Sequence, residues 1–117
     1  MTPDRTDSPV KNVRWLETSA VVDVVGDIDL ACSTQFQQAV LDVVSQKPAK
    51  LVINLAGVSY VDSSGVASLV KILSRARKMG MPFKLAHMNG RVRSVFEITR
   101  LDTVFDICDT EEEALSG

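Results

Sequence analysis

The sequence is poor in the residues on which disulfides, metal sites and aromatic cores depend. It contains two cysteines, one histidine and only 5% aromatic residues. Cys32 and Cys108 stand far apart, outside any CxxC motif or Cys/His cluster, so we predict neither a disulfide framework nor a metal site. The core must therefore be aliphatic. This cysteine usage fits the reducing cytoplasm, where we expect the protein to reside.

Long apolar segments are also missing. No run of the residues AVILMFWYC exceeds three, whereas a membrane-spanning helix needs about 20 apolar residues, so we predict no membrane insertion. The first ten residues contain two prolines, two aspartates and one arginine without an apolar stretch, which is unlike a secretory signal. We interpret residues 1–10 as a flexible N-terminal tail and residues 11–117 as one domain.

The chain has no excess of positive charge. Its 13 Lys and Arg residues face 15 Asp and Glu residues, for a net charge of −2, so we predict no nucleic-acid partner. A length of 117 residues leaves room for one hydrophobic core of ordinary size. The composition therefore indicates a single small globular domain with one principal site.

Motifs for nucleotide binding and catalysis are lacking. The chain has neither G-x-x-x-x-G-K-[ST] nor G-x-G-x-x-G, so we predict no cofactor. A nucleophilic serine needs a G-x-S-x-G turn and a histidine base, but the only histidine, His87, is better explained as a packed imidazole at a strand end. Asp23, Asp27 and Asp29 alternate with apolar residues, which is more typical of a solvated strand end than of a cation site. We expect that the protein is not an enzyme.

Alternating period-2 and period-3.6 hydrophobic patterns predict a single α/β domain. We expect a mainly parallel sheet of four to five strands, an N-terminal hairpin and about four helices, because helices separate the later strands. Gly26–Asp29 is predicted to end the second strand and Ala56–Val61 to form a loop. The unpaired edges of such a sheet also allow a weak homodimer. The predicted strands lie at residues 13–16, 19–25, 51–55, 83–86 and 104–107, and the predicted helices follow residues 32, 62, 90 and 109.

Ligands and partners of parallel sheets usually meet the loops at the carboxyl ends of the strands, here residues 26–33 and 56–65. The second loop ends in Asp62-Ser63-Ser64-Gly65, which opens a helix. Asp and Ser are preferred N-cap residues, so simple capping explains this tetrapeptide. Alternatively, one hydroxyl is presented for phosphorylation, because a helix N-terminus tolerates a phosphate. The residues alone leave both interpretations open.

Three segments together resemble the STAS family, and within it the bacterial anti-sigma factor antagonists. They are VSYVDSSG at 58–65, the following ASLVKILSRARKMG, and NGRVRSVFEITRLDTVFDI from residue 89. The resemblance extends from about residue 13 to 115, and GDID at 26–29 stands where relatives commonly carry GELD. It implies that Ser63 is the phosphoacceptor. Asp62, Ser64 and Gly65 would shape its loop and Asp29 would lie beside it, so that these five residues bind the partner.

The resemblance also implies a partner-switching mechanism. Unphosphorylated, the domain would bind an anti-sigma factor that is also a serine kinase. This kinase would phosphorylate Ser63 and release the domain, and a serine phosphatase would reverse the modification. The alternative is a STAS subunit that binds the ATPase of a lipid-transport ABC complex. The Asp-Ser-Ser-Gly motif argues against it, because some such subunits lack the phosphoacceptor.

Overall fold

The computed structural model describes residues 9–116, and its order of elements agrees with the predicted one. After an N-terminal hairpin of two strands, three further strands alternate with four α-helices, and a short 3₁₀ helix precedes the last strand. The elements are β1 Val10–Leu16, β2 Ser19–Ile28, α1 Ser33–Val44, β3 Lys50–Val61, α2 Ser63–Lys78, β4 Phe83–Ala86, α3 Gly90–Ile98, η1 Leu101–Thr103, β5 Asp106–Cys108 and α4 Glu111–Ser116.

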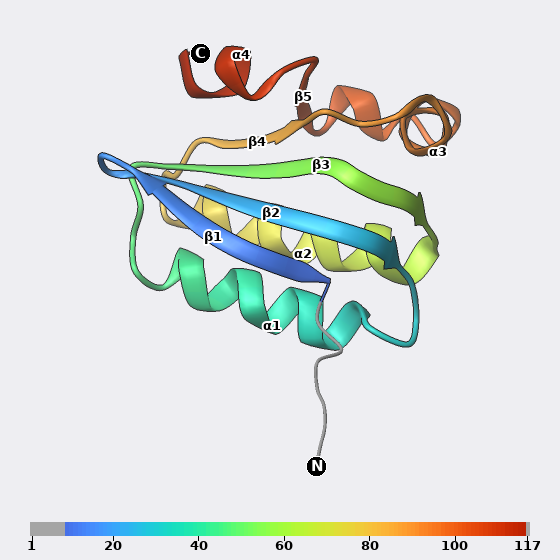
Figure 1. Ribbon diagram of the computed structural model, residues 1–117, viewed down its shortest axis with the longest axis horizontal. Helices are drawn as coiled ribbons and strands as arrows, with labels where there is room; N and C mark the ends of the chain where they lie inside the picture. The colour runs from blue at the N-terminus through green and yellow to red at the C-terminus, as the bar shows by residue number, and fades with distance from the viewer. Residues whose placement is uncertain (1–8, 117) are drawn as a thin grey trace.

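The five strands form one sheet in the order β1-β2-β3-β4-β5. β1 and β2 are antiparallel, and every other neighbouring pair is parallel. Figure 1 shows α1 and α2 lying along one face of the sheet, with α4 on the opposite side near β4 and β5. The predicted fold class is therefore confirmed: a single α/β domain built on a mainly parallel sheet.

Strand alternation divides the buried residues between the two faces of the sheet. The main core is mostly aliphatic, as the low aromatic content predicts, but it also contains all four phenylalanines of the chain. It joins the sheet to α1, α2 and α3 through side chains such as Ile53, Leu69 and Leu85. Each such aliphatic side chain contributes about 1.5–3 kcal/mol when buried. A second, small cluster lies under α4 on the other face and consists of Val21, Val52, Ala86 and Ala114.

The two strands that lead to the candidate loops are longer than predicted. Gly26 does not end β2 but adopts a φ of 82° within it, and the pairing register shifts between Gly26 and Asp27. Glycine tolerates this left-handed conformation, so the strand continues through a bulge. The predicted loop Ala56–Val61 is likewise part of β3, which pairs with β2 as far as Ile28 and Val61. Both predicted boundaries are wrong because the pairing between β2 and β3 continues beyond them.

The N-terminal boundary also differs from the prediction. Val10, placed in the tail by composition, is the first residue of β1, and the carbonyl of Pro9 accepts a hydrogen bond from the backbone N–H of Val25 at 2.9 Å. The rest of the predicted tail, residues 1–8, lies outside the described residues. Within residues 9–116, no helix combines the length and apolar character that a bilayer crossing requires.

The starts of α1 and α3 do not depend on hydroxyl caps. No hydroxyl caps α1, and Ser33 is buried within it. The cap of α3 is Asn89, whose side-chain oxygen accepts from Val92 N–H at 2.8 Å while its amide donates to the Val58 carbonyl at 2.9 Å. Thr99 follows the end of α3 and is exposed.

Polar side chains hold α4 against the sheet. Arg14 on β1 contacts both Asp23 and Glu111, and the Asn54 amide donates to the same Glu111 carboxylate at 3.0 Å. Hydrogen bonds from Arg14 lower the pKa of Asp23 and that of Glu111. Lys50 adds hydrogen bonds from its ammonium group to two carbonyls of α4.

We expect Arg14→Gln to destabilise the fold by about 1 kcal/mol at pH 7, a small effect because the guanidinium is more than one-third exposed. Because the pKa values of Asp23 and Glu111 are lower in the folded protein, these carboxylates stabilise the fold at pH values above the pKa values of the unfolded chain, about 3.9 and 4.3. This contribution is lost as the pH falls through the lower folded values. Urea unfolding of both proteins should therefore show a difference at pH 7 that shrinks at pH 2. Arg91→Gln is the control, and a difference independent of pH would contradict the prediction.

Candidate functional site

The loops that follow β2 and β3 meet at one edge of the sheet (Figure 1). The two strands are parallel neighbours, so their carboxyl ends lie side by side, as predicted. The backbone N–H of Asp62 donates to the Ile28 carbonyl at 3.1 Å, and this bond joins the two loops directly. The structure thus brings together the segments that carry Asp29 and Ser63.

Asp62 is the residue that organises this edge. One carboxylate oxygen caps α2 by accepting from Ser64 N–H at 2.8 Å and Gly65 N–H at 3.0 Å. The other oxygen accepts from Leu30 N–H at 3.2 Å, in the neighbouring loop. Capping by an aspartate contributes about 1 kcal/mol. The carboxylate therefore both begins the helix and fixes the distance between the loops.

Asp29 forms a compact turn that leads into α1. Its side chain accepts from Ala31 N–H at 3.1 Å, and its carbonyl accepts from the N–H groups of Cys32 and Ser33 at 3.1 and 2.8 Å. The Asp29 carbonyl thus takes the place of a side-chain cap at the start of this helix. Asp29 is half-buried beside the Asp62 loop, so it shapes the same edge of the sheet.

Gly65 lets α2 approach β2 closely. A Cβ atom at this position would lie 2.4 Å from the Ile28 carbonyl oxygen and 2.8 Å from a methyl group of Val61. Such contacts are far shorter than van der Waals distances, so only glycine fits without a shift of the backbone. Gly65 consequently sets the height at which the start of α2 sits above the sheet.

Ser63 is the exposed residue of this group. Because Asp62 caps α2, the Ser63 hydroxyl is not needed for capping, and within residues 9–116 it makes no hydrogen bond. The Ser63 backbone N–H, at the first helical position, is also without a partner in the described chain. Ser64 is half-buried. Of the two hydroxyls, that of Ser63 is therefore the more accessible.

Carboxylates dominate the charge of the two loops. Together with the strand ends that lead into them, the two loops span residues 26–33 and 56–65 and contain Asp27, Asp29 and Asp62 but no lysine or arginine. Cys32 donates its thiol to the Asp27 carbonyl at 3.2 Å, and burial raises the pKa of this thiol, so it is protonated and unreactive at neutral pH. The edge is an acidic surface that includes the exposed Ser63 hydroxyl.

Two apolar side chains beside this acidic surface were not predicted. Leu30 is 77% exposed and follows Asp29, and Tyr60 is 43% exposed on β3, two residues before Asp62. A large exposed apolar residue in a loop is typical of an interaction surface. The sequence signal was a single leucine between aspartate and alanine in a predicted loop, which belongs to no chemical motif.

The remaining candidates for chemistry lie elsewhere or have structural partners. The half-buried His87 accepts the Glu111 backbone N–H at 3.0 Å through Nε2, at the start of α4. Asp23 pairs with Arg14 on the face of the sheet where α4 packs. Across residues 9–116, no three His, Cys, Asp or Glu side chains gather as metal ligands would.

Comparisons with known proteins agree with this architecture. The chain is 30% identical over 101 residues to the anti-sigma-B factor antagonist of Bacillus subtilis, covering 86% of this chain and 92% of that protein. It is 31% identical over 100 residues to the anti-sigma-F factor antagonist RsfB of Mycobacterium tuberculosis, covering 84% and 80%.

Solved structures and family models extend the comparison. A crystal structure of an anti-sigma factor antagonist from Mycobacterium paratuberculosis superposes with a TM-score of 0.82 at 28% identity, covering 97% of both chains. The STAS domain family model matches residues 11–114, which is nearly the whole chain. The family suggested by the sequence motifs is therefore confirmed, and the chain belongs to the STAS domain family.

Proposed function

We propose that this protein is an anti-sigma factor antagonist that is switched by phosphorylation of Ser63. Unphosphorylated, it binds an anti-sigma factor that is also a serine kinase, and the phosphorylated form is released until a serine phosphatase restores it. The observation that carries the proposal is the exposed Ser63 hydroxyl, which has no hydrogen-bond partner within residues 9–116 while Asp62 caps the helix. The named relatives support the same role.

The local geometry explains how the fold tolerates a phosphate. The new group extends from the first turn of α2, where the helix dipole favours negative charge. The free Ser63 N–H offers it one hydrogen bond. None of the contacts of Asp62 or Gly65 has to break. Modification therefore leaves the domain folded.

The surrounding charge explains how the same phosphate expels a partner. It adds about −1.5 to −2 charges. The two loops hold three aspartates and no cation that could fold over it, so the charge stays on the surface. A partner that contacts the unmodified serine then meets electrostatic repulsion and must desolvate a phosphate. In this mechanism the protein is a substrate and a reversible ligand, and it needs neither a cofactor nor a catalytic group.

A pull-down from the source organism's cytoplasm tests the proposal. Wild type and Ser63→Ala should retain a serine-kinase anti-sigma factor, whereas Ser63→Asp should not. Adding ATP to the purified pair should attach one phosphate, which mass spectrometry maps to Ser63, and Ser63→Ala should remain unmodified. Phosphate that persists on Ser63→Ala contradicts the assignment. Recovery of an ABC-transporter ATPase instead of a kinase would support the transport alternative.

Leu30→Ala should weaken binding of the anti-sigma factor about tenfold without changing stability, because an exposed apolar residue beside the serine loses contact area. Isothermal titration calorimetry measures the affinity and thermal unfolding the stability. The matched control is Ile98→Ala, since Ile98 is 81% exposed on α3. Equal losses for both variants would show that Leu30 is not part of the interface.

A further inference from the structure

A groove runs along the outer surface of the helical layer, between α1 and α2, away from Ser63. It has a volume of about 210 Å³. Three of its lining side chains are cationic and lie on one face of α2, while α1 contributes neutral residues. The groove is lined by Gln37, Leu41, Lys71, Ser74, Arg75 and Lys78.

The cations of this groove lack internal counterions among the described residues. Within residues 9–116, Lys71, Arg75 and Lys78 form no ion pair or side-chain hydrogen bond. The only acid on α1, Asp42, accepts a hydrogen bond from Gln38 and does not line the groove. A chain with a net charge of −2 thus concentrates three positive charges in one groove without a carboxylate.

Helix electrostatics explains only part of this arrangement. Cations in the last turn of a helix stabilise its dipole, which accounts for Arg75 and Lys78. Lys71 lies seven residues before the end of α2, where this effect has faded. Its alignment with the other two, at spacings of four and three residues, places all three on one face of the helix.

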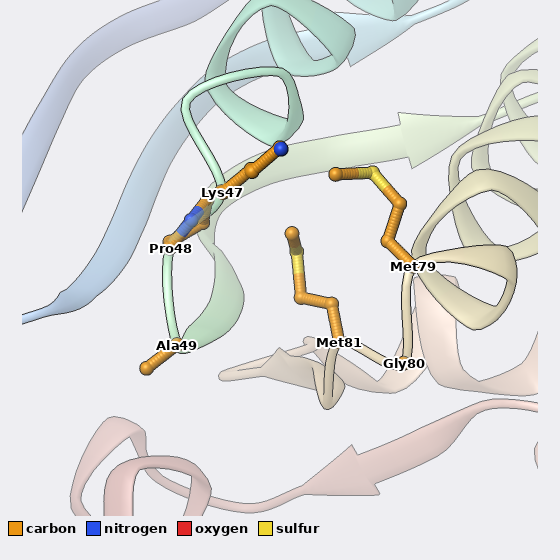
Figure 2. A pocket seen from close by; sticks show the side chains of 6 residues that line it. All are labelled: Lys47, Pro48, Ala49, Met79, Gly80 and Met81. Atoms are coloured by element: carbon orange, nitrogen blue, oxygen red, sulfur yellow. The ribbon is translucent and has the colours of Figure 1, made fainter.

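A second pocket, lined by one lysine and otherwise by apolar residues and glycine, lies near the C-terminal ends of the two helices. It has a volume of about 400 Å³ and is lined by Lys47, Pro48, Ala49, Met79, Gly80 and Met81. Figure 2 shows the Met79 and Met81 side chains extending toward the Lys47–Pro48 segment. Met79 directly follows Lys78, so the last cation of the groove adjoins the pocket. Methionine side chains are flexible and adapt to different apolar partners.

We propose that this groove and pocket form a second protein-binding site, which takes an acidic helix carrying one apolar anchor. The three cations are spaced by about 6.0 and 4.5 Å along α2, at a rise of about 1.5 Å per residue. Carboxylates at positions i, i+4 and i+7 of a helix lying alongside have the same spacing. An apolar side chain at i+11 lies on the same face and reaches the methionine pocket.

The second site is independent of the serine switch. Lys71 and Lys78 follow Ser63 by 8 and 15 residues within one helix, which corresponds to about 12 and 22 Å at about 1.5 Å per residue. A partner at Ser63 and a helix in the groove can therefore occupy the same molecule. Phosphorylation alters the first site and leaves the second accessible.

The test uses the full-length, ¹⁵N-labelled protein and a synthetic 16-residue helical peptide with glutamates at i, i+4 and i+7 and leucine at i+11. We expect chemical-shift changes confined to residues 37–49 and 71–81, with a submillimolar Kd that weakens as salt is added. The double variant Arg75→Glu/Lys78→Glu should bind at least about tenfold more weakly. Lys71→Gln/Arg75→Gln serves as a milder second variant.

Four controls decide the outcome. Arg91→Glu, which reverses an exposed cation on α3, and Ser63→Asp should both bind the peptide like wild type. A peptide with glutamine in place of glutamate should bind at least about tenfold more weakly. Equal affinity for the glutamine peptide, or shifts centred on Ser63, would overturn the proposal. So would binding to phosphatidylglycerol vesicles or inorganic phosphate with no binding of the peptide.

Discussion

Gly65→Ala should destabilise the domain by about 3 kcal/mol, the upper end of what an added methyl group costs in a packed interior. The new Cβ would lie 2.4 Å from the Ile28 carbonyl oxygen, which belongs to a paired strand and cannot move independently. Relief requires α2 to lift from the sheet, which would lengthen the hydrogen bond between Asp62 N–H and the same carbonyl. Equilibrium unfolding in urea measures the loss.

Gly90→Ala is the matched control for this substitution. A Cβ atom at residue 90 meets no other atom within 4 Å, and the position opens α3. Alanine has the higher helix propensity, so this variant should match or exceed wild-type stability by up to about 1 kcal/mol. If both variants have the same stability as wild type, the close approach of α2 to β2 does not constrain residue 65.

The regular elements could be predicted from local patterns because their side chains alternate clearly between the core and solvent. The buried run Leu51–Leu55 predicts a central strand, and β3 occupies the middle of the sheet. The continuations of β2 and β3 could not be predicted in this way. Gly26 and Gly57 break the local pattern, and only the pairing of the two strands with each other sustains them.

The candidate site could be located from sequence, but not the division of roles within it. Either Asp62 or Ser63 can cap a helix, and only coordinates show that the carboxylate does so while the hydroxyl stays free. The docking of α4 was also unpredictable, because Glu111 meets Arg14 across 97 positions of sequence. Contacts between distant residues leave no local pattern.

Ser63→Asp should lower the affinity for the anti-sigma factor about 100-fold, which corresponds to about 2.8 kcal/mol. A carboxylate at this position adds a fourth negative charge to two loops that hold Asp27, Asp29 and Asp62 and contain no cation. Ser63→Ala should bind about as well as wild type, because the serine hydroxyl makes no hydrogen bond within the described residues. Titration calorimetry with the purified partner measures all three affinities.

The stability of Ser63→Asp separates a switch from a structural serine. The residue occupies the first turn of α2, where a negative charge interacts favourably with the helix dipole by about 0.3–1 kcal/mol. The variant should therefore keep its circular dichroism spectrum and unfold at an equal or higher urea concentration while it loses its partner. Ser64→Asp, at a half-buried position, is the control for charge alone and should be the less stable protein. Unfolding of Ser63→Asp would instead mean that the loop depends on an uncharged serine, because a domain that fails to fold loses its partner without any switch.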